Sequence, residues 1–362
     1  MTIEHSNLVR ITEQSFGRLS TGEEARLFTL TNQQGMQIKI TNFGGIIVSI
    51  FTHDKTQRLA DIVLGYDRVS DYENDTYYLG AVIGRYAGRI DKGQFELDGE
   101  LHQLELNAPD SQLHGGKNAL NKKLWQASTE QNDKSASVIL NYTSLDGEEG
   151  FPGDVDFKVK YQLNDDNEFI VEYFATTNKN TIVNLTQHSY FNLAGHNAGN
   201  IHQHQVSINA EHFLPMSERA YPTGEIKPVN NTAHDFTVLR RLADNIDNNH
   251  DQQINIGLGY DNYWLLNDQA TKAEENAAYV VEENSGRTMT LYTDQPSIIL
   301  YTANYIDGSH YGKANFCYQK RAALCLEPQR ANNKHTGVNI NNCKLTPEQP
   351  FYSKTRYVFG VI

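Results

Sequence analysis

The feature that most constrains the fold is an alternation of apolar and polar side chains between residues 155 and 163. Valine, phenylalanine, valine, tyrosine and leucine occupy every second position there, and aspartate, lysine, lysine and glutamine fill the positions between them. A period of two places successive side chains on opposite faces of a β-strand, one face buried and the other solvated. The segment therefore predicts a strand in a sheet that packs on one side.

Most of the remaining chain has the same strand character. Asp98-Gly99 lies between two short runs of strand-forming residues, which is a strong signal for a β-hairpin. Helical patterns are scarce, and only residues 67–72 and 238–246 could hold short helices. Many short strands separated by turns predict an all-β fold, an antiparallel sandwich or barrel. We expect residues 1–362 to form one such domain, although single cores usually stop growing at ~250–300 residues.

Charge and cysteine content narrow the class of protein. Lysine plus arginine is 31 and aspartate plus glutamate is 44, so the net charge of −13 disfavours a duplex nucleic-acid binder or a polybasic membrane-surface protein. Three cysteines do not make a disulfide scaffold for a chain of this length. Residues 1–10 include Glu4 and lack the apolar core of a secretory signal. No apolar run approaches the ~20 residues of a membrane helix. These features predict a cytoplasmic protein with no nucleic-acid or membrane partner.

Motifs for common cofactors and metals are missing from the sequence. It contains no GxxxxGK[ST], no HExxH and no GxSxG. Asp247, Asn249 and Asp251 have the spacing that begins a calcium loop. However, Gln252 stands where such a loop needs glycine, and Leu258 replaces its bidentate glutamate. The sequence motifs therefore give no indication of a phosphate-binding loop, a zinc helix or a calcium loop.

Four residues lie where the local sequence favours acid–base or binding chemistry. His114 precedes two glycines, which allow a backbone to approach a ligand closely. His188 lies in a stretch that interleaves polar and aromatic residues, a mixture suited to hydroxyls and a ring face. Glu327 follows the apolar run 322–326, where burial would raise the pKa of a carboxyl and improve it as a base near neutrality. Asp261 lies among aromatic residues. The ordinary alternatives are a turn histidine, a buried histidine, a solvated carboxylate and an Asp–Asn turn.

Two arginines, Arg85 and Arg89, are four residues apart and would share one face of a strand. Either could bind a ligand through bidentate hydrogen bonds or pair with a surface carboxylate. The sequence pattern does not choose between these roles.

Taken together, these segments resemble the aldose 1-epimerase (galactose mutarotase) family. The resemblance runs in order through residues 42–45, 63–67, 84–90, 113–116, 146–153, 184–193, 222–225, 259–261 and 326–329. Any one of these blocks is weak, but the set in this order is specific. It implies a large antiparallel β-sandwich that interconverts the α and β anomers of free hexoses, galactose or glucose, without cofactor or metal.

The resemblance also implies roles for the catalytic residues. Glu327 resembles the general base that removes the proton from the C1 hydroxyl. His188 resembles the general acid that protonates the ring oxygen. His114 resembles a second active-site histidine that orients or polarises the sugar.

Further residues resemble the family's substrate-binding positions. Asp261 and Arg89 resemble the groups that hold sugar hydroxyls, and Gln295 matches a position that faces the substrate. Tyr190 could pack against the sugar. Gly88 is a departure, because some relatives have asparagine directly before the binding arginine, and the glycine could alter sugar preference.

Three alternatives remain at this point. A relative acting on a hexose 6-phosphate would need a basic subsite for the phosphate. A noncatalytic sugar-binding protein would not need both Glu327 and His188. A polysaccharide lyase or hydrolase would need a long open groove and another acid–base pair. The sequence leaves open the preferred hexose and the choice between monomer and homodimer.

Overall fold

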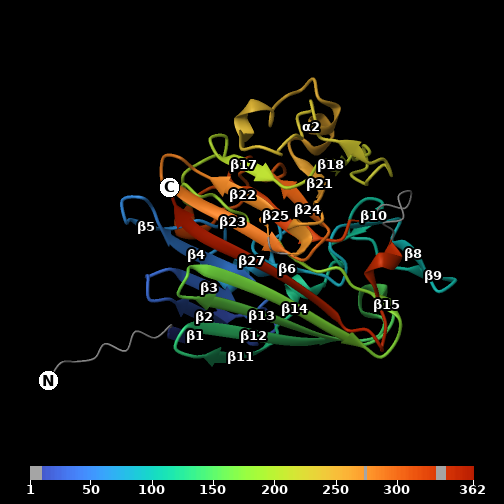
Figure 1. Ribbon diagram of the computed structural model, residues 1–362. Helices are drawn as coiled ribbons and strands as arrows, with labels where there is room; N and C mark the ends of the chain where they lie inside the picture. The colour runs from blue at the N-terminus through green and yellow to red at the C-terminus, as the bar shows by residue number, and fades with distance from the viewer. Residues whose placement is uncertain (1–9, 273–274, 332–339) are drawn as a thin grey trace.

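The computed structural model describes residues 10–272, 275–331 and 340–362 (Figure 1). Neighbouring strands in its sheets run antiparallel, and these residues include two short α-helices, α1 (Val69–Glu73) and α2 (Gln252–Gly257). The expected all-β class with few short helices is confirmed. We expect no signal peptide in residues 1–10. All of these residues except Arg10 lie outside the described part of the chain. In the described part of the chain, no helix is both long and apolar enough to cross a membrane.

The largest sheet has nine strands and forms one layer of the protein. Its order is β11 (Gln126–Gln131), β12 (Ser135–Ser144), β13 (Val155–Asn164), β14 (Glu168–Thr177), β27 (Phe351–Val361), β23 (Arg287–Thr293), β22 (Ala278–Val281), β17 (Gln205–Ile208) and β20 (Arg240–Arg241). The alternation at residues 155–163 is confirmed, because the apolar side chains of β13 are buried and the polar ones between them are exposed or half-buried. The apolar face of this sheet supplies much of the hydrophobic core.

An N-terminal sheet forms a second layer beside the first (Figure 1). It consists of β1 (Arg10–Arg18), β2 (Glu24–Thr31), β3 (Gln37–Thr41), β4 (Ile47–His53) and β5 (Leu59–Asp61). Leu30, Ile38 and Ile50 from this sheet belong to the same buried cluster as Val138 and Val159 from the nine-stranded sheet. The two sheets therefore share one core, as the layers of a β-sandwich do.

A third sheet, which we call the cavity sheet, separates this core from the candidate active site. Its strands are β19 (Lys227–Pro228), β18 (His212–Leu214), β21 (Asp261–Leu265), β24 (Ser297–Tyr301) and β25 (Cys325–Gln329). Leu300 and Leu326 on one face belong to the main core, whereas Tyr263, Ile299 and Tyr301 on the other face belong to a second buried cluster. The alternation of side chains along each strand thus gives the sheet one core face and one site face.

Short strand pairs and 3₁₀ turns complete the fold around the cavity sheet. The pairs are β6 (Val82–Ile83) with β16 (Thr186–Gln187), β7 (Arg89–Asp91) with β10 (Ser111–Leu113), β8 (Gln94–Leu97) with β9 (Glu100–Gln103), and β15 (Thr181–Ile182) with β26 (Lys344–Leu345). The 3₁₀ turns are Leu120–Lys122, Glu148–Gly150, Leu242–Asp244, Ala270–Lys272, Lys313–Asn315 and Ile340–Cys343. The hairpin expected at Asp98-Gly99 is confirmed, because β8 and β9 pair on either side of it. The short helix considered at residues 67–72 corresponds to α1.

The helix considered at residues 238–246 does not form. Val238 is 61% exposed and Leu239 is 41% exposed, whereas Leu242 and Ile246 are buried, so the apolar residues of this segment do not form one continuous buried helical face. Arg240–Arg241 instead forms an edge strand against β17, followed by the 3₁₀ turn. Asp251, one of the three residues with calcium-loop spacing, has a structural role. It accepts hydrogen bonds from two backbone N–H groups and caps the N-terminus of α2.

A buried ion pair ties the N-terminal sheet to a distant part of the chain. Lys313 Nζ lies 2.6 Å from Asp61 Oδ2 and also donates to the carbonyl oxygens of Val48 and Val63, at 2.8 and 2.7 Å. Both side chains are more than 90% buried. The ammonium group therefore has a full set of acceptors in place of water.

Candidate active site

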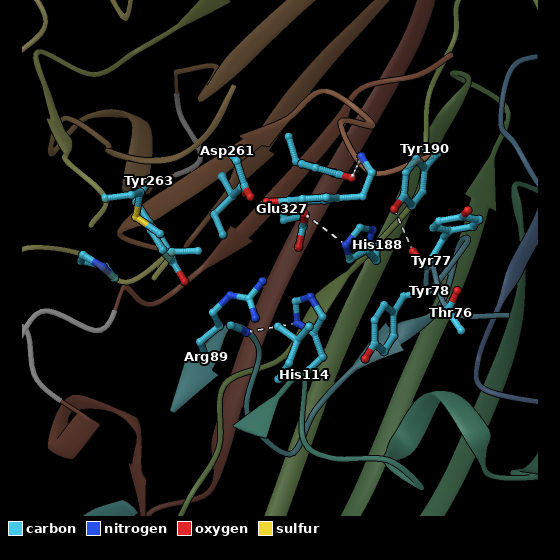
Figure 2. A pocket seen from close by; sticks show the side chains of 18 residues that line it. Thr76, Tyr77, Tyr78, Arg89, His114, His188, Tyr190, Asp261, Tyr263 and Glu327 are labelled. Carbon is cyan, nitrogen blue, oxygen red and sulfur yellow. Dashed lines mark hydrogen bonds and ion pairs between the residues drawn. The ribbon is translucent and has the colours of Figure 1, made fainter. Parts of the chain in front are cut away.

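A cavity of about 290 Å³ opens on the site face of the cavity sheet (Figure 2). Its ionisable lining groups, apart from tyrosine, are Arg89, His114, His188, Asp261 and Glu327. Its aromatic lining consists of Tyr77, Tyr78, Tyr190, Tyr263, Tyr301 and Tyr305. Rings and a few convergent polar groups are the usual composition of a small-molecule site.

Strand register places the two carboxylates on this face. Asp261 on β21 lies opposite Tyr301 on β24, and Ile299 on β24 lies opposite Glu327 on β25. All four residues line the cavity. Because residues two apart on a strand point to the same side, this face is a fixed grid of side chains rather than a flexible loop.

Backbone contacts on both sides hold His188 above this grid. It directly follows β16, its N–H donates to the Ala81 carbonyl and its own carbonyl accepts from the Gly80 N–H, each at 2.9 Å. The ring nitrogen Nε2 lies 3.6 Å from Glu327 Oε1. The ring stacks on Tyr190 with centroids 5.0 Å apart. Position and orientation of the imidazole are thus both constrained by the fold.

His114 enters from the opposite side, together with Arg89 (Figure 2). Arg89 on β7 pairs with Leu113 on β10, which brings it next to His114. The His114 Nδ1 accepts a hydrogen bond of 3.2 Å from the Gly88 N–H, so the proton of the neutral ring is on Nε2. Gly115 is required after it, because a Cβ there would lie 2.0 Å from the Gly84 carbonyl oxygen.

Burial sets the protonation of these groups. It raises the pKa of Glu327 well above its usual value, and the nearby charge of Asp261 raises that pKa further. It also lowers the pKa of His188 to about 4 and that of His114 well below its usual range. For Asp261, burial raises the pKa to about 6, although the charge of Arg89 opposes the shift. Glu327 Oε2 is buried with no hydrogen-bond partner among the described residues, so a ligand hydroxyl could satisfy it.

Comparison with known proteins gives the family of the chain. The family model described as Aldose 1-epimerase matches residues 26–358. The chain belongs to the aldose 1-epimerase family. A Sus scrofa protein named galactose mutarotase is 37% identical over 98% of this chain and 100% of its own length. An aldose 1-epimerase of Escherichia coli K12 is 32% identical over 93% of this chain and 96% of its own length. The crystal structure of a galactose 1-epimerase from Lactobacillus acidophilus superposes with a TM-score of 0.86, at 25% identity, covering 98% of this chain and 99% of that one.

The structure of this member of the aldose 1-epimerase family brings together six of the seven site residues expected from sequence. These residues are Arg89, His114, His188, Tyr190, Asp261 and Glu327. Tyr190 lines the cavity, and its hydroxyl donates to the Tyr77 carbonyl oxygen at 2.8 Å.

Gln295 does not line this cavity, contrary to the position expected for it. It lies just after β23, and its amide nitrogen donates to Ser353 Oγ at 2.8 Å and to Asp294 Oδ1 at 3.1 Å. The amide nitrogen is therefore held by residues near the ends of strands β23 and β27, and Gln295 is not among the described residues that line the cavity.

Arg85 and Arg89, which were expected to lie on one face of a strand, point to different surroundings. Arg89 lines the cavity, whereas Arg85 is buried and donates to the carbonyls of Ser144, Leu145, Pro152 and Gly153. Arg85 thus satisfies backbone acceptors from residues 144–153. Neither the ligand-binding role nor the surface ion pair considered from the sequence applies to Arg85.

Sequence reasoning missed the other tyrosines of the wall. Tyr78 packs edge-on against the His114 ring at 4.8 Å, and Tyr301 stacks with Tyr305 at 6.1 Å. The Tyr77–Tyr78 pair was a possible signal, but tyrosine is common in strands, so its presence alone does not indicate a site. Gly88 also lines the cavity, and a Cβ at this position would lie 2.7 Å from Tyr263 Oη. An asparagine here would have to displace that tyrosine.

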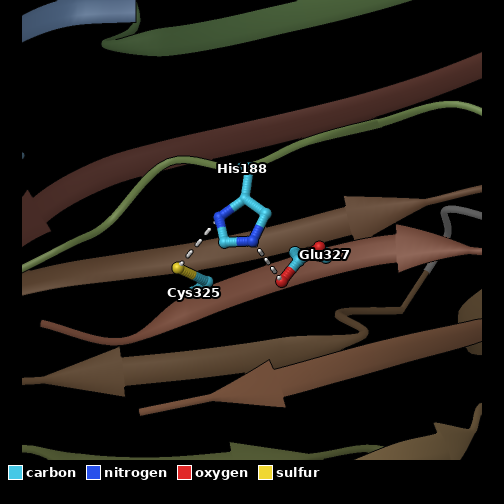
Figure 3. Close-up of side chains that lie close together, drawn as sticks. All are labelled: His188, Cys325 and Glu327. Atoms are coloured by element: carbon cyan, nitrogen blue, oxygen red, sulfur yellow. Dashed lines mark hydrogen bonds and ion pairs between the residues drawn. The ribbon is translucent and has the colours of Figure 1, made fainter. Parts of the chain in front are cut away.

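Three atoms that could ligate a metal, from His188, Cys325 and Glu327, lie within 4.8 Å of one another. The imidazole Nδ1 faces the sulfur and Nε2 faces the carboxylate, so one ion could not use both ring nitrogens (Figure 3). A metal would also require a thiolate, whereas burial raises the pKa of the Cys325 thiol well above its usual value. The arrangement suits hydrogen bonding better than metal chelation.

Proposed function

We propose that this chain interconverts the α and β anomers of free hexoses such as galactose and glucose, by acid–base catalysis of ring opening and closure. The observation that carries the proposal is the placement of Glu327 and His188 in one cavity wall, with Oε1 and Nε2 3.6 Å apart. The names of the relatives, galactose mutarotase and aldose 1-epimerase, support the same reaction class.

The proposed reaction needs two proton transfers at one sugar. The Glu327 carboxylate takes the proton of the C1 hydroxyl, the bond between C1 and the ring oxygen breaks, and the ring oxygen receives the Nε2 proton of His188. A carbonyl forms at C1. Rotation about the C1–C2 bond presents the other carbonyl face, and the same two residues close the ring in reverse. Each well-placed acid or base supplies ~10²–10⁴-fold, and positioning supplies more.

The remaining lining groups suit the binding of a neutral sugar. The Asp261 carboxylate and the Arg89 guanidinium lie where they could accept from and donate to ring hydroxyls. His114 presents its Nε2 proton from the side opposite the cavity sheet. The tyrosine rings offer flat apolar faces for the C–H groups of the sugar.

The pH profile follows from the directions of the pKa shifts. Because burial raises the pKa of Glu327 and lowers that of His188 to about 4, the pair holds one proton over the interval between these values. Within this pH interval, a fraction of the protein that does not change with pH carries the shared proton on His188. In that fraction Glu327 is a carboxylate and His188 is an imidazolium. Activity is lost below the interval, where both groups are protonated, and above it, where neither is.

We therefore expect kcat/KM to show an alkaline fall at a pH far above the usual carboxyl range, and an acid fall near the pKa of about 4 of His188. A further step near pH 6 is expected as Asp261 takes up a proton. The substitution Asp261→Asn should remove this step and move the alkaline fall to lower pH, because it removes a charge that raises the pKa of Glu327. Initial-rate polarimetry across the pH range, corrected for spontaneous mutarotation, measures this profile. A profile in which kcat/KM falls only at low pH, with no decrease at high pH, would contradict this prediction.

The hexose 6-phosphate alternative is less well supported. A phosphate dianion is bound by clustered cations, whereas Arg89 is the one lysine or arginine among the described residues that line the cavity. That guanidinium is also close enough to Asp261 to oppose the rise in its pKa. A noncatalytic sugar-binding protein would have no need for the buried Glu327–His188 pair.

The proposal also includes a single-domain protein that works in the cytoplasm as a monomer or homodimer. One hydrophobic cluster contains residues from Phe28 to Phe359, which supports a single domain. The cysteines Cys317, Cys325 and Cys343 are all free, as in proteins of a reducing compartment.

Polarimetry of freshly dissolved α-D-galactose and α-D-glucose, with chelator present, tests the proposed activity. We expect the protein to accelerate the approach to an unchanged final rotation. No acceleration for either sugar by a folded protein would contradict the proposal. Hexose 6-phosphates and equilibrium sugar binding would then distinguish the alternatives.

A further inference from the structure

The hydroxyl of one cavity tyrosine takes no part in the proposed proton transfers. Among the described residues that line the cavity, the most deeply buried tyrosines are Tyr190, Tyr263 and Tyr301. The Tyr190 hydroxyl donates to the Tyr77 carbonyl oxygen, and the Tyr301 hydroxyl accepts from the Tyr305 N–H at 3.1 Å. The Tyr263 hydroxyl has no hydrogen-bond partner among the described residues. A buried tyrosine hydroxyl usually has a partner, so a ligand in the cavity would supply the missing one.

Strand register places Tyr263 in the same row of the cavity sheet as the proposed base. Tyr263 on β21 lies opposite Ile299 on β24, and Ile299 lies opposite Glu327 on β25. All three residues line the cavity. Because neighbouring strands are ~4.8 Å apart, the backbones of Tyr263 and Glu327 are about 10 Å apart, with Ile299 between them. A sugar ring that lies over Ile299 therefore has Glu327 on one side and Tyr263 on the other.

The Tyr263 hydroxyl occupies space that is open only because residue 88 is glycine. A Cβ at Gly88 would lie 2.7 Å from Tyr263 Oη, too close to be accommodated unless the tyrosine moves. The backbone at Gly88 is itself held in place, because its N–H donates to His114 Nδ1 and its carbonyl accepts from the His114 N–H at 2.9 Å. Tyr263 and Arg89 lie on the same side of the cavity (Figure 2). The glycine thus lets a phenolic hydroxyl lie beside the cavity arginine.

The charges around Tyr263 keep its hydroxyl protonated. Burial raises the pKa of Tyr263, and the nearby charges of Glu327 and Asp261 raise it further, although Arg89 opposes the shift. A neutral phenol can donate one hydrogen bond and accept another. This is the hydrogen-bonding capacity that a neutral sugar hydroxyl also has, so the two groups suit each other.

The proposed proton transfers fix how the sugar ring lies in the cavity. With the C1 hydroxyl at Glu327 and the ring oxygen at His188, the opposite atoms of the six-membered ring are C4 and C3. We propose that the Tyr263 hydroxyl binds the hexose hydroxyl at C3 or C4, and that Gly88 makes this contact possible by leaving the required space. This inference rests on the proposed function for the orientation of the sugar. Galactose and glucose differ only in configuration at C4, so the contact lies at the edge that distinguishes them.

The first test is Tyr263→Phe, which keeps the ring and removes the hydroxyl, assayed by polarimetry on galactose and its 2-deoxy, 3-deoxy and 4-deoxy analogues. The loss of one hydrogen bond should lower kcat/KM for galactose and 2-deoxygalactose by ~2- to 12-fold. Most of this loss should appear as a higher KM, because the contact is present before the ring opens. For either the 3-deoxy or the 4-deoxy sugar, the variant and the wild type should have the same kcat/KM.

Tyr142→Phe is the matched control for the removal of a phenolic hydroxyl. Tyr142 lies outside the cavity, and its hydroxyl donates to Glu148 Oε1 at 2.7 Å. This variant should keep the wild-type kcat/KM for all four sugars. A loss that depends on the sugar in Tyr263→Phe would therefore report contact with the substrate and not a general effect on the fold.

Gly88→Ala tests the role of the glycine in a double-mutant cycle. The added Cβ should lower kcat/KM at least ~2-fold more in the wild-type background than in the Tyr263→Phe background, where the hydroxyl that it would displace is already missing. Gly88 has a φ of +93°, which strains a residue with a side chain, but this strain is common to both backgrounds and cancels in the comparison. If Gly88→Ala does not fold, Tyr263→Phe with the deoxy sugars still gives the answer.

Three results would overturn the proposal. They are an unchanged kcat/KM for galactose in Tyr263→Phe, equal losses for all four sugars, and equal effects of Gly88→Ala in the two backgrounds. If the wild-type protein opens no hexose, the proposed function fails. Calorimetric titration with galactose and the deoxy sugars then still shows whether Tyr263→Phe weakens binding of galactose selectively. No binding of galactose to the wild-type protein would overturn both proposals.

Discussion

Replacing Glu327 with glutamine should lower kcat by about 10²–10⁴-fold, because the reaction loses the group that accepts the C1 hydroxyl proton. The amide has nearly the same volume and cannot act as a base at neutral pH. KM should change little, since the other lining groups remain. The thermal midpoint should be unchanged or higher, because a buried carboxyl with an unpartnered oxygen is replaced by a neutral group. Single-turnover polarimetry and differential scanning fluorimetry measure the two effects.

Glu282→Gln is the matched control for this substitution. Glu282 is also buried, directly after β22, but it lies outside the cavity and accepts backbone hydrogen bonds from Asn284 and Ser285. The Glu282→Gln variant should be somewhat less stable than the wild type and should keep the wild-type kcat. If Glu327→Gln retained kcat within about threefold, when a general base normally contributes ~10²–10⁴-fold, Glu327 would not be the base.

The second large effect expected is on stability. Lys313→Met should lower the free energy of unfolding by about 3–5 kcal/mol, because it leaves the buried Asp61 without its cation and several carbonyls without their donor. Lys313 does not line the cavity, so kcat of the folded protein should remain close to that of the wild type. Urea denaturation followed by circular dichroism measures the change.

A surface pair gives the comparison for this stability prediction. Lys179 and Asp146 form an ion pair whose side chains are 57% and 48% exposed, and Lys179→Met should cost less than about 1 kcal/mol. Adding Asp61→Asn to Lys313→Met should recover part of the loss, because the unpaired buried charge is removed. Equal costs for Lys313→Met and Lys179→Met would show that burial of the pair carries no weight.

Local patterns in the sequence were enough to predict a strand-rich fold and to single out several candidate site residues. The alternation at residues 155–163 and the Asp98-Gly99 turn are decided by neighbouring residues, and the structure confirms both. His114, His188 and Glu327 were identified because glycines, aromatic residues or an apolar strand flank each of them. Their convergence in one cavity, however, was expected only from the family resemblance.

The features that sequence reasoning missed depend on long-range packing. Arg85 looked equivalent to Arg89, but its carbonyl acceptors come from residues 144–153, which its neighbours in the chain do not reveal. Residues 238–246 could have held a short helix, yet Val238 and Leu239 at its start are exposed. The side-chain amide of Gln295 donates a hydrogen bond to Ser353, which is almost sixty positions away in the sequence. The contact between the Cys325 sulfur and the His188 ring likewise joins segments that are distant in the sequence.

The tyrosine wall of the cavity also decides how sugar binding can be observed by spectroscopy. Six tyrosines of the described chain line the cavity, whereas Trp125 and Trp264, the two tryptophans of the chain, are both in the main hydrophobic core. Trp264 lies on the opposite face of β21 from Tyr263. Tryptophan emission should therefore report unfolding of the core and respond weakly to sugar. Near-ultraviolet difference absorbance of tyrosine should report occupancy of the cavity, so folding and binding can be followed separately in one sample.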